Sequence, residues 1–290
     1  MSILYSLNSR LKQLLPKSFY QKVRGYYFSF LKKRQKKFSR EEFKALLQER
    51  LGVKEGVDVF IHSSINQINL DFPYYEIVAI IQEVVGEKGT LLFPVWKNIK
   101  NFEEYAKNQV FDVKRTTGDM GILPELVRRR KDAHRSLHPV NSIVAIGYNA
   151  EWYINTHHQD IYPAGYKSPF YKLIEKKGMI IGLGVSSRYL SFSHCIEDIM
   201  GTEFPLQTRS SEALTFKVKK TDGELIEVKS LVPHKNIVDR DVPKFLKKHI
   251  PKEIAEDLKI GGTAFFTVQA KELAERMIEL GKKGITIYNF

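Results

Sequence analysis

Residues 179–198 read MIIGLGVSSRYLSFSHCIED, and the predicted architecture is built around them. It opens with an apolar run from Met179 to Val185 that contains two glycines, a pattern typical of a strand buried on both faces. The next residues turn the chain, after which Ser191 or Ser193 can cap a helix. The stretch therefore predicts a buried strand that passes through a short turn into a helix.

The predicted helix carries His194 and Glu197, the two residues on which the chemistry depends. A separation of three positions places both side chains on one face. The helix also begins near the carboxyl end of a buried strand, where α/β proteins bind their ligands. An imidazole beside an orienting carboxylate transfers protons, so we predict His194 as a general base. A surface ion pair has the same His-x-x-Glu spacing and is the structural alternative.

The composition points to a globular body preceded by a basic arm. The chain has 290 residues, of which 43% are hydrophobic, enough for the core of one large domain or two small ones. Its net charge of +13 is concentrated at the N-terminus. Residues 1–40 contain 11 basic and no acidic residues, which leaves 35 of the 46 basic residues against 33 acidic ones in the rest of the chain.

The basic arm, residues 1–38, places leucine and aromatic residues at helical spacing among Lys and Arg. A helix of this kind lies on an anionic membrane surface, so we predict that residues 1–37 contact one. The alternatives are a disordered basic tail, and packing against the body or against the second subunit of a homo-oligomer. No DNA- or RNA-binding motif accompanies the charge, so a nucleic-acid partner is not expected.

The cysteine count and the hydropathy indicate the compartment. The single cysteine, Cys195, excludes an internal disulfide and suits a reducing compartment. No apolar run approaches the roughly 18 to 20 residues that span a bilayer, and the first residues lack the pattern of a signal peptide. We therefore expect a cytoplasmic protein, peripheral on the inner face of the membrane if its arm binds there.

Beyond the central stretch, strands and helices alternate at the spacing of βα units. Strands are predicted at 57–61, 89–94, 142–147 and 261–268, and residues 212–230 alternate like a hairpin with Asp222-Gly223 at its turn. Helices are predicted at 39–52, 75–85, 122–130, 170–176 and 270–280. This order predicts a layered α/β fold.

Six segments, taken in order, resemble the aminoglycoside 3-N-acetyltransferase family: VFIHSSI, GTLLFPVW, FDVKRTTGDMGILPELVRRR, HRSLHPVNSIVAIG, SPFYKLIEKKGMIIGLGV and SHCIED. The segment GGTAFFTVQAKELAERMIEL fits as well, so the resemblance covers roughly residues 40–285. It implies a three-layer α/β/α fold for an acetyltransferase domain at residues 39–290, distinct from the GNAT acetyltransferases. It also implies transfer of an acetyl group from acetyl-CoA to an amino group on a sugar, with no metal.

The resemblance also assigns catalytic residues. The family's His-x-x-Glu falls on His194 and Glu197, and the hydroxyl residue three positions before the histidine falls on Ser191. It therefore implies direct transfer, with His194 as the base, Glu197 fixing its tautomer and Ser191 holding the thioester or oxyanion. Ser193 stands where relatives commonly carry an apolar residue, which leaves the substrate open. The acceptor is an aminoglycoside, or a nucleotide- or lipid-linked amino sugar of surface polysaccharide.

Coenzyme A carries a diphosphate and a ribose phosphate, which bind to backbone N–H groups, hydroxyls and cations. The resemblance and the residue types together indicate a coenzyme-binding set of Ser63, Ser64, Arg135, Ser136, His138 and Ser168. The resemblance implies that Ser168 lies near the pantetheine. The alternative is that Ser63, Ser64 and Ser168 simply cap helices. His138 is either a second base or a residue that holds its loop in place.

Three other classes of protein stay open. The first is a thiol acyltransferase that uses Cys195, although the adjacent His194 cannot be its base. The second is a metal-dependent hydrolase that uses His134, His138 and His194. The third is a non-catalytic coenzyme- or nucleotide-binding protein, in which residues 182–184, Gly-Leu-Gly, cradle a phosphate.

Overall fold

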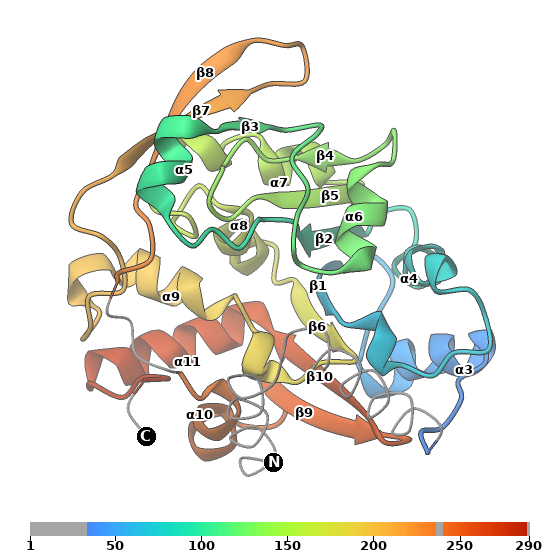
Figure 1. The fold of residues 1–290 in the computed structure, drawn as a ribbon. Coiled ribbons are helices and arrows are strands. Elements are labelled where there is room, and N and C mark those ends of the chain that lie inside the picture. The colour runs from blue at the N-terminus through green and yellow to red at the C-terminus, as the bar shows by residue number, and fades with distance from the viewer. Residues whose placement is uncertain (1–33, 236–239, 289–290) are drawn as a thin grey trace, which may run out of the picture.

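The computed structural model describes residues 34–235 and 240–288 (Figure 1). At its centre lies a mixed seven-stranded sheet with the strand order β4-β5-β2-β1-β6-β10-β9. The strands are β1 (Asp58–Ser63), β2 (Thr90–Pro94), β4 (His134–Arg135), β5 (Ile143–Gly147), β6 (Met179–Leu183), β9 (Ala255–Ile260) and β10 (Thr263–Gln269). The strands predicted near residues 57–61, 89–94, 142–147, 179–185 and 261–268 are all in this sheet, so these predictions are confirmed.

The three central strands run parallel and determine where a site can form. β1 pairs in parallel with both β2 and β6, and Phe60 lies opposite Leu92 on one side and Ile180 on the other. All five residues of β6 are buried, as its apolar run predicts. β5 and β10 flank this trio in antiparallel pairing. The carboxyl ends of β1, β2 and β6 therefore meet at one edge of the sheet.

Helices cover both faces of the sheet and form the three layers that the family resemblance implies (Figure 1). One face packs against α3 (Arg40–Ala45), α4 (Ile77–Val85) and α6 (Ile122–Arg128). The other face packs against α7 (Ala150–Ile154), α8 (Pro169–Glu175), α9 (Ser193–Met200), α10 (Val242–His249) and α11 (Ala270–Lys282). Successive residues of a strand point to opposite faces, so Phe60 joins one core while Val59 and Ile61 join the other.

The helices predicted from apolar periodicity are present, with ends that differ by a few residues. The helix predicted at 39–52 is α3 followed by a π-helical turn, Leu46–Arg50, and it starts with a capping box between Ser39 and Glu42. Periodicity does not predict the short elements α5 (Phe102–Asn108), α7, α10, β4 and β9. Each of these elements has between two and eight residues.

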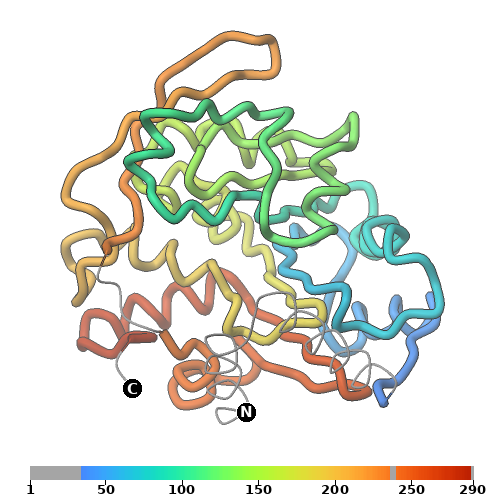
Figure 2. The backbone as a smooth tube through the Cα atoms, viewed as in Figure 1, coloured from blue at the N-terminus to red at the C-terminus, as the bar shows by residue number. Residues whose placement is uncertain are grey.

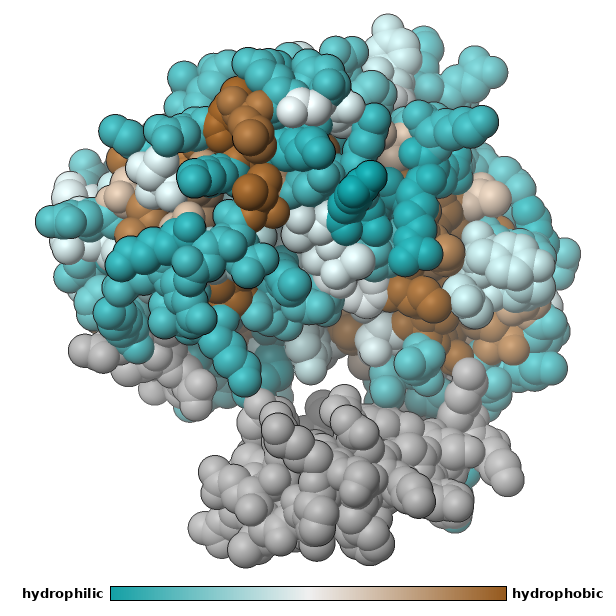
Figure 3. Space-filling model, turned by 45° about the horizontal axis from the view of Figure 1, so that its top comes forward, coloured by the Kyte–Doolittle hydropathy of each residue, from teal (hydrophilic) through white to brown (hydrophobic). Residues whose placement is uncertain are grey.

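A second, smaller sheet consists of β3 (Val110–Asp112), β7 (Leu214–Lys219) and β8 (Leu225–Ser230) in the order β3-β7-β8. β7 and β8 form the predicted hairpin, whose turn is closed by the Lys220 N–H donating to the Glu224 carbonyl at 2.8 Å. Figure 3 turns this end of the molecule forward and shows a mainly hydrophilic face with separate hydrophobic patches. The loop after β3 returns to the main sheet, because Gly118 packs directly on the Val95 carbonyl that follows β2.

The described chain starts beside the last strands of the main sheet (Figure 2). The Lys36 N–H donates to the Gly261 carbonyl at 2.8 Å, and Phe38 is buried edge-on against Phe265. The packed body thus includes Lys36 and Phe38, which precede the predicted domain boundary at residue 39. Residues 1–33 of the predicted arm lie outside the described residues, so its contact with a membrane stays a prediction. Among the described helices, none combines the length and the apolar character needed to cross a bilayer.

The start of α9 differs from its prediction. The helix begins at Ser193, but its N-cap position is Phe192 and no side chain caps it. Ser193 Oγ donates to the Leu190 carbonyl at 3.1 Å, and Ser191 Oγ lies 3.3 Å from His62 Nε2. The prediction that Ser191 or Ser193 caps the helix is therefore wrong, because both hydroxyls have other partners.

Candidate active site

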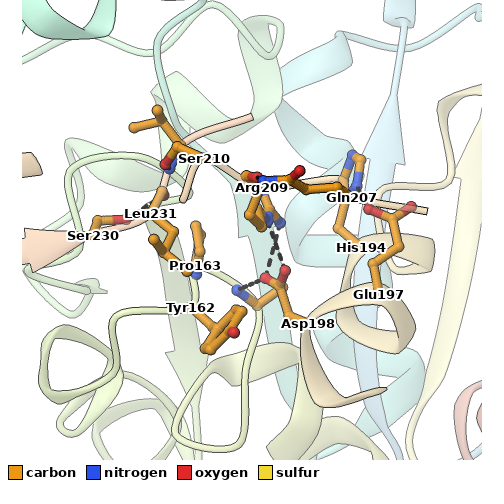
Figure 4. Close-up of polar contacts among 12 residues, drawn as sticks. Tyr162, Pro163, His194, Glu197, Asp198, Gln207, Arg209, Ser210, Ser230 and Leu231 are labelled. Carbon is orange, nitrogen blue, oxygen red and sulfur yellow. Dashed lines mark hydrogen bonds and ion pairs between the residues drawn. The ribbon is translucent and has the colours of Figure 1, made fainter. Parts of the chain in front are cut away.

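α9 brings His194 and Glu197 together beyond the carboxyl end of β6. His194 Nδ1 lies 2.8 Å from Glu197 Oε2, as their spacing on one helix face predicts. The His194 side chain is 23% exposed, whereas the Glu197 side chain is 1% exposed. Figure 4 shows both side chains projecting from α9 to one side of Asp198. The pair is a buried carboxylate that holds a partly exposed imidazole, which is not the arrangement of a surface ion pair.

The buried Glu197 carboxylate has a partner for each oxygen. His194 binds Oε2, and the Tyr288 hydroxyl donates to Oε1 at 2.9 Å. Burial by itself raises the pKa of the Glu197 carboxyl, but the interactions with His194, Arg209 and Tyr288 outweigh it, so that its pKa lies below its ordinary value. The ionised carboxylate accepts the Nδ1–H of His194 and thereby fixes the tautomer of the ring.

Arg240 contacts the other ring nitrogen of His194. Its Nη1 lies 3.0 Å from His194 Nε2 and 2.9 Å from Ser193 Oγ. A guanidinium can only donate, so Nε2 accepts and holds the lone pair, while Nδ1 carries the proton toward Glu197. The hydrogen-bond partners therefore assign His194 as the neutral tautomer whose Nε2 can accept a proton.

A second histidine, His62, lies near the carboxyl end of β1 and positions Ser191. Its Nε2 is 3.3 Å from Ser191 Oγ. Burial, together with the charge of Arg240, lowers the pKa of His62 to about 3, so its ring is neutral near pH 7. Ser191 is thus held between β1 and α9 by an uncharged partner.

The residue after Glu197 on α9, Asp198, ties the helix to two other segments (Figure 4). Arg209 Nε lies 2.6 Å from Asp198 Oδ1, Arg209 Nη2 lies 2.8 Å from Oδ2, and the Ala164 N–H donates to Oδ2 at 2.8 Å. Both charged side chains are buried. Burial raises the pKa of Asp198 above its ordinary value although Arg209 opposes the shift. These contacts fix the orientation of α9 and hence that of His194.

The carboxyl end of β1 provides a hydroxyl that a ligand can use. Ser63 Oγ is buried and has no hydrogen-bond partner among the described residues. The Ser64 N–H donates to the Leu183 carbonyl at 2.8 Å, which joins β1 to the end of β6. A Cβ on Gly121 would lie 3.3 Å from the Ser63 carbonyl, so the loop that leads into α6 passes close to β1 here. Ser63 and Ser64 therefore lie at the same edge of the sheet as the start of α9.

Arg135 is buried, and its guanidinium binds other parts of the protein. Nε donates to Ser142 Oγ at 2.8 Å. The Nη donors bind the carbonyls of Val113, Thr116 and Val95, at 3.1, 2.5 and 2.9 Å. Burial lowers the pKa of Arg135 to about 9. Arg135 does not fit the predicted role of a phosphate ligand, because its donors hold the loop after β3 against the main sheet.

Ser136 and His138 also have internal partners. Ser136 Oγ accepts from the Ile143 N–H at 3.0 Å and lies 3.0 Å from His157 Nδ1. His138 is fully buried and stacks on His157, with ring centroids 4.5 Å apart. Burial lowers the pKa of His138 well below its ordinary value. The Asn141 N–H donates to His138 Nδ1 at 3.4 Å, whereas His138 Nε2 has no hydrogen-bond partner among the described residues. This placement fits the alternative that His138 holds its loop, and the full burial of the ring against His157 disfavours a contact with the coenzyme.

Ser168 caps a helix, which is the alternative role that the sequence left open for it. It is the N-cap residue of α8, and its buried hydroxyl accepts from the Tyr171 N–H at 3.3 Å. Pro169 follows in the first turn, a position that suits proline. Ser168 therefore stabilises the start of α8. Its hydroxyl is fully buried, so the structure gives no support to the predicted contact with the pantetheine.

The central residues of two alternative sites, the thiol of Cys195 and the Gly-Leu-Gly phosphate cradle, have packing roles in the structure. Cys195 is fully buried, and burial raises the pKa of its thiol well above the ordinary value, which disfavours the reactive thiolate. A Cβ on Gly182 would lie 2.1 Å from ring atoms of Phe266. Glycine at 182 therefore makes room for an aromatic ring on the neighbouring strand, which explains it without a phosphate cradle.

The third rival site, a metal centre, is not assembled in the described part of the chain. Within residues 34–235 and 240–288, no three His, Cys, Asp or Glu side chains are grouped as they would have to be to hold a metal ion. His138 is buried against His157, whereas His134 is exposed on β4. The three histidines of the hydrolase alternative, His134, His138 and His194, therefore do not form a cluster.

Sequence patterns do not reveal three contributors to the site. Tyr288, Arg240 and His62 contact Glu197, His194 and Ser191 respectively, and each comes from a distant part of the chain. None belongs to a motif with its partner. Only His62 stands in a suggestive position, at the end of a predicted strand.

We expect Glu197→Gln to make the stability of the protein less dependent on pH below about 4.3, the ordinary Glu pKa. The folded pKa of Glu197 is lowered, so in this range the unfolded chain binds more protons and the wild-type protein loses stability as the pH falls. The variant lacks this contribution, and the difference in unfolding free energy from wild type should shrink from pH 7 to pH 3.5 in chemical denaturation. The exposed Glu253→Gln is the control. A constant difference across this range would contradict the prediction.

A family model and one curated relative connect the chain with known proteins. The model described as aminoglycoside 3-N-acetyltransferase matches residues 60–281. Aminoglycoside N(3)-acetyltransferase VII from Streptomyces paromomycinus is 29% identical over 162 residues, which cover 51% of this chain and 56% of that protein. The chain spans little more than half the length of the curated relatives that it matches.

Solved structures share the fold. The complex described as AAC-IIIb binary with CoASH superposes with a TM-score of 0.72 at 22% identity, over 87% of this chain and 98% of that chain. AAC-VIa bound to sisomicin superposes with a TM-score of 0.68 at 20% identity, over 86% and 99% of the two chains. At these identities the superpositions establish a common fold.

Proposed function

Since the chain belongs to the aminoglycoside 3-N-acetyltransferase family, we propose that it transfers the acetyl group of acetyl-CoA to an amino group of an amino sugar. The observation that supports this most directly is the chain of contacts from Tyr288 through Glu197 to His194, which leaves the Nε2 lone pair on a partly exposed ring. A base of this kind is what an amine needs, because its ammonium form cannot attack a thioester.

In the proposed reaction His194 is the general base. The acceptor amine donates an N–H to Nε2 as its nitrogen bonds to the acetyl carbonyl carbon and the carbon–sulfur bond breaks. The proton passes to His194 and from there to the departing thiolate, so that an amide and free coenzyme A are formed. Glu197 stabilises the transient imidazolium, and the buried Tyr288 hydroxyl holds Glu197 in place.

Ser191 is proposed to hold the thioester carbonyl during this step. Its hydroxyl lies beside His62, whose ring is neutral and can accept or donate at Nε2 according to its tautomer. When His62 Nε2 carries the proton and donates to Ser191 Oγ, the Ser191 hydroxyl can donate its own hydrogen to the oxygen on which negative charge develops. His62 acts on the reaction only through Ser191 and is therefore a positioning residue.

The donor substrate needs hydroxyl and amide groups at the carboxyl edge of the sheet, and the chain offers them there. The unpartnered, buried Ser63 Oγ is a polar group that a ligand can satisfy, and Ser64 is its neighbour at the end of β1. We propose these two residues, and not Arg135, Ser136, His138 or Ser168, as contacts of the coenzyme. CoASH bound to AAC-IIIb, which shares this fold, supports a coenzyme site.

The direct test is a screen of amines with acetyl-CoA, in which released thiol is measured and the product is identified by mass spectrometry. Aminoglycosides, simple amino sugars and nucleotide-linked amino sugars are the acceptors to compare. Aminoglycosides are included because AAC-VIa, which shares this fold, binds sisomicin. Thiol release that does not require an amine, or an acetylated product that is not an amide, would contradict the proposed function.

We expect Ser63→Ala to raise the KM for acetyl-CoA by roughly threefold to tenfold, the effect of one lost hydrogen bond. The unfolding free energy of the free protein should not fall, because Ser63 Oγ has no partner among the described residues to lose. Ser168→Ala is the matched control. It removes the cap of α8 and should cost about 0.5–2 kcal/mol of stability without that rise in KM. If Ser168→Ala raised the KM for acetyl-CoA and Ser63→Ala did not, the coenzyme would lie near α8 instead.

A further inference from the structure

The acceptor side of the site contains a positive charge. Arg240 Nη1 contacts both His194 Nε2 and Ser193 Oγ, and Arg240 immediately precedes Asp241, the N-cap residue of α10. The charge of Arg240 also reaches the buried His62 and Tyr288, lowering the pKa of the first and opposing the raised pKa of the second. Arg240 is therefore directed into the reaction centre.

The described carboxylates near Arg240 are committed to other partners. Glu197 binds His194 and Tyr288 with its two oxygens, and its side chain is almost wholly buried. Asp241, the residue after Arg240, accepts the Lys244 N–H as the N-cap of α10. Within residues 34–235 and 240–288 no carboxylate forms an ion pair with Arg240. An acceptor that approaches His194 therefore meets the positive charge of Arg240, whereas the carboxylate of Glu197 is buried behind His194 and Tyr288.

The position of this cation restricts the acceptor. To give up a proton, the amine nitrogen must come within about 3 Å of His194 Nε2. Arg240 Nη1 is itself 3.0 Å from Nε2, so the amine nitrogen and Nη1 are at most about 6 Å apart. A polycationic acceptor would bring further ammonium groups toward Arg240. An acceptor with an anionic group near its amine would pair with Arg240 and draw it away from the Nε2 lone pair.

We propose that the acceptor is an anionic amino sugar, with a phosphate or carboxylate near the reacting amine, and that Arg240 selects it. This inference rests on the proposed function and narrows its substrate class. The shared chemistry is a negatively charged oxygen within reach of the guanidinium. A sugar carboxylate and the diphosphate of a nucleotide-linked sugar are its two sources. A guanidinium binds both with paired N–H donors.

A different role for Arg240 has a different signature. If Arg240 only holds the His194 ring in place, its loss should lower turnover of every acceptor by the same factor. If Arg240 selects the acceptor, its loss should reduce kcat/KM most for anionic acceptors. In the variant the ratio of kcat/KM for anionic acceptors to kcat/KM for uncharged acceptors should then be close to one. The ratio of kcat/KM values, and not the activity itself, therefore distinguishes the two roles.

The experiment compares one amino sugar in three forms, an uncharged glycoside, a sugar carboxylate and a nucleoside diphosphate conjugate, with sisomicin as the polycation. Acetyl-CoA is the donor, and released thiol and the amide product are measured. Wild-type enzyme should prefer at least one anionic form over the uncharged form by roughly tenfold or more, the range of one charged hydrogen bond. Whichever anionic form is preferred identifies the source of the charge.

Arg240→Met should reduce that preference by roughly tenfold or more, whereas Arg240→Lys should keep part of it because the charge remains. Lys247→Met is the matched control, since it removes one charge from the exposed side of α10 and should leave the preference at the wild-type value. Arg240→Gln is a second neutral variant if Arg240→Met does not fold.

Three results would overturn the inference. They are equal kcat/KM for charged and uncharged forms in the wild type, a wild-type preference for sisomicin, and an equal loss for all acceptors in Arg240→Met. If the wild type acetylates none of these amines but binds acetyl-CoA, the proposed function fails, and the inference falls with it. Acetylation of the uncharged form without anionic preference would sustain the proposed function and refute only the selection by Arg240.

Discussion

Replacing His194 with alanine should lower kcat by about 10² to 10⁴, the contribution that a positioned general base makes. Binding of acetyl-CoA should change little, because the proposed coenzyme contacts are at Ser63, the last residue of β1, and at Ser64, which follows it. Steady-state kinetics gives the first quantity, and calorimetric titration with acetyl-CoA the second. The expected effect is large because, among the described residues that contact Glu197, only His194 has a ring nitrogen that can accept a proton, and its ring is partly exposed.

The control for this variant is His134→Ala, which makes the same change at an exposed residue of β4. It should keep wild-type turnover and stability. A His194→Ala protein that retains a third of the wild-type turnover would remove His194 from the role of base. A loss of activity in His134→Ala equal to that in His194→Ala would instead revive the alternative in which these histidines act together.

Arg209→Met should lower the free energy of unfolding by about 3–5 kcal/mol, the usual cost of leaving one member of a buried ion pair alone. Both side chains of the Asp198–Arg209 pair are buried, and Asp198 also accepts the Ala164 N–H. Without Arg209 the Asp198 carboxylate would be buried without its counter-charge. Chemical denaturation of wild type and variant at pH 7 measures the loss.

A double variant separates the charge from the packing. Asp198→Leu combined with Arg209→Met removes both charges, so it should recover much of the stability that Arg209→Met loses. Arg276→Met provides the exposed comparison, because Arg276 pairs with Glu279 on the surface of α11 and its loss should have little effect. If Arg209→Met were as stable as wild type, the pair could not be what fixes α9 and the base on it.

The local part of the site can be predicted from the sequence because its geometry depends on short chain separations. An apolar run of strand length predicts β6, and the residues that follow it predict α9. Once the helix is predicted, its period alone brings His194 beside Glu197. The position of Ser63 and Ser64 at the sheet edge also follows, because parallel strands end together.

The surroundings of Arg135, Ser136, His138 and Ser168 could not be predicted in this way. A sequence shows that an arginine or a serine can donate a hydrogen bond, but not whether another part of the protein already takes it. Arg135 binds carbonyls that lie 19 to 40 positions away in the chain. Backbone carbonyls and phosphate oxygens accept the same N–H donors, so residue type alone cannot tell these partners apart.

The amino-acid sequence alone therefore predicts the layered fold, the strand that leads into α9 and the pairing of His194 with Glu197. The surroundings of that pair become visible only in the folded structure. Tyr288 is 91 positions from Glu197, and Arg240 is 46 positions from His194. The physical reason is that helical and strand periods relate residues only a few positions apart. Contacts over longer separations depend on how whole elements pack, and packing sets the burial, charge and hydrogen bonding that the base experiences.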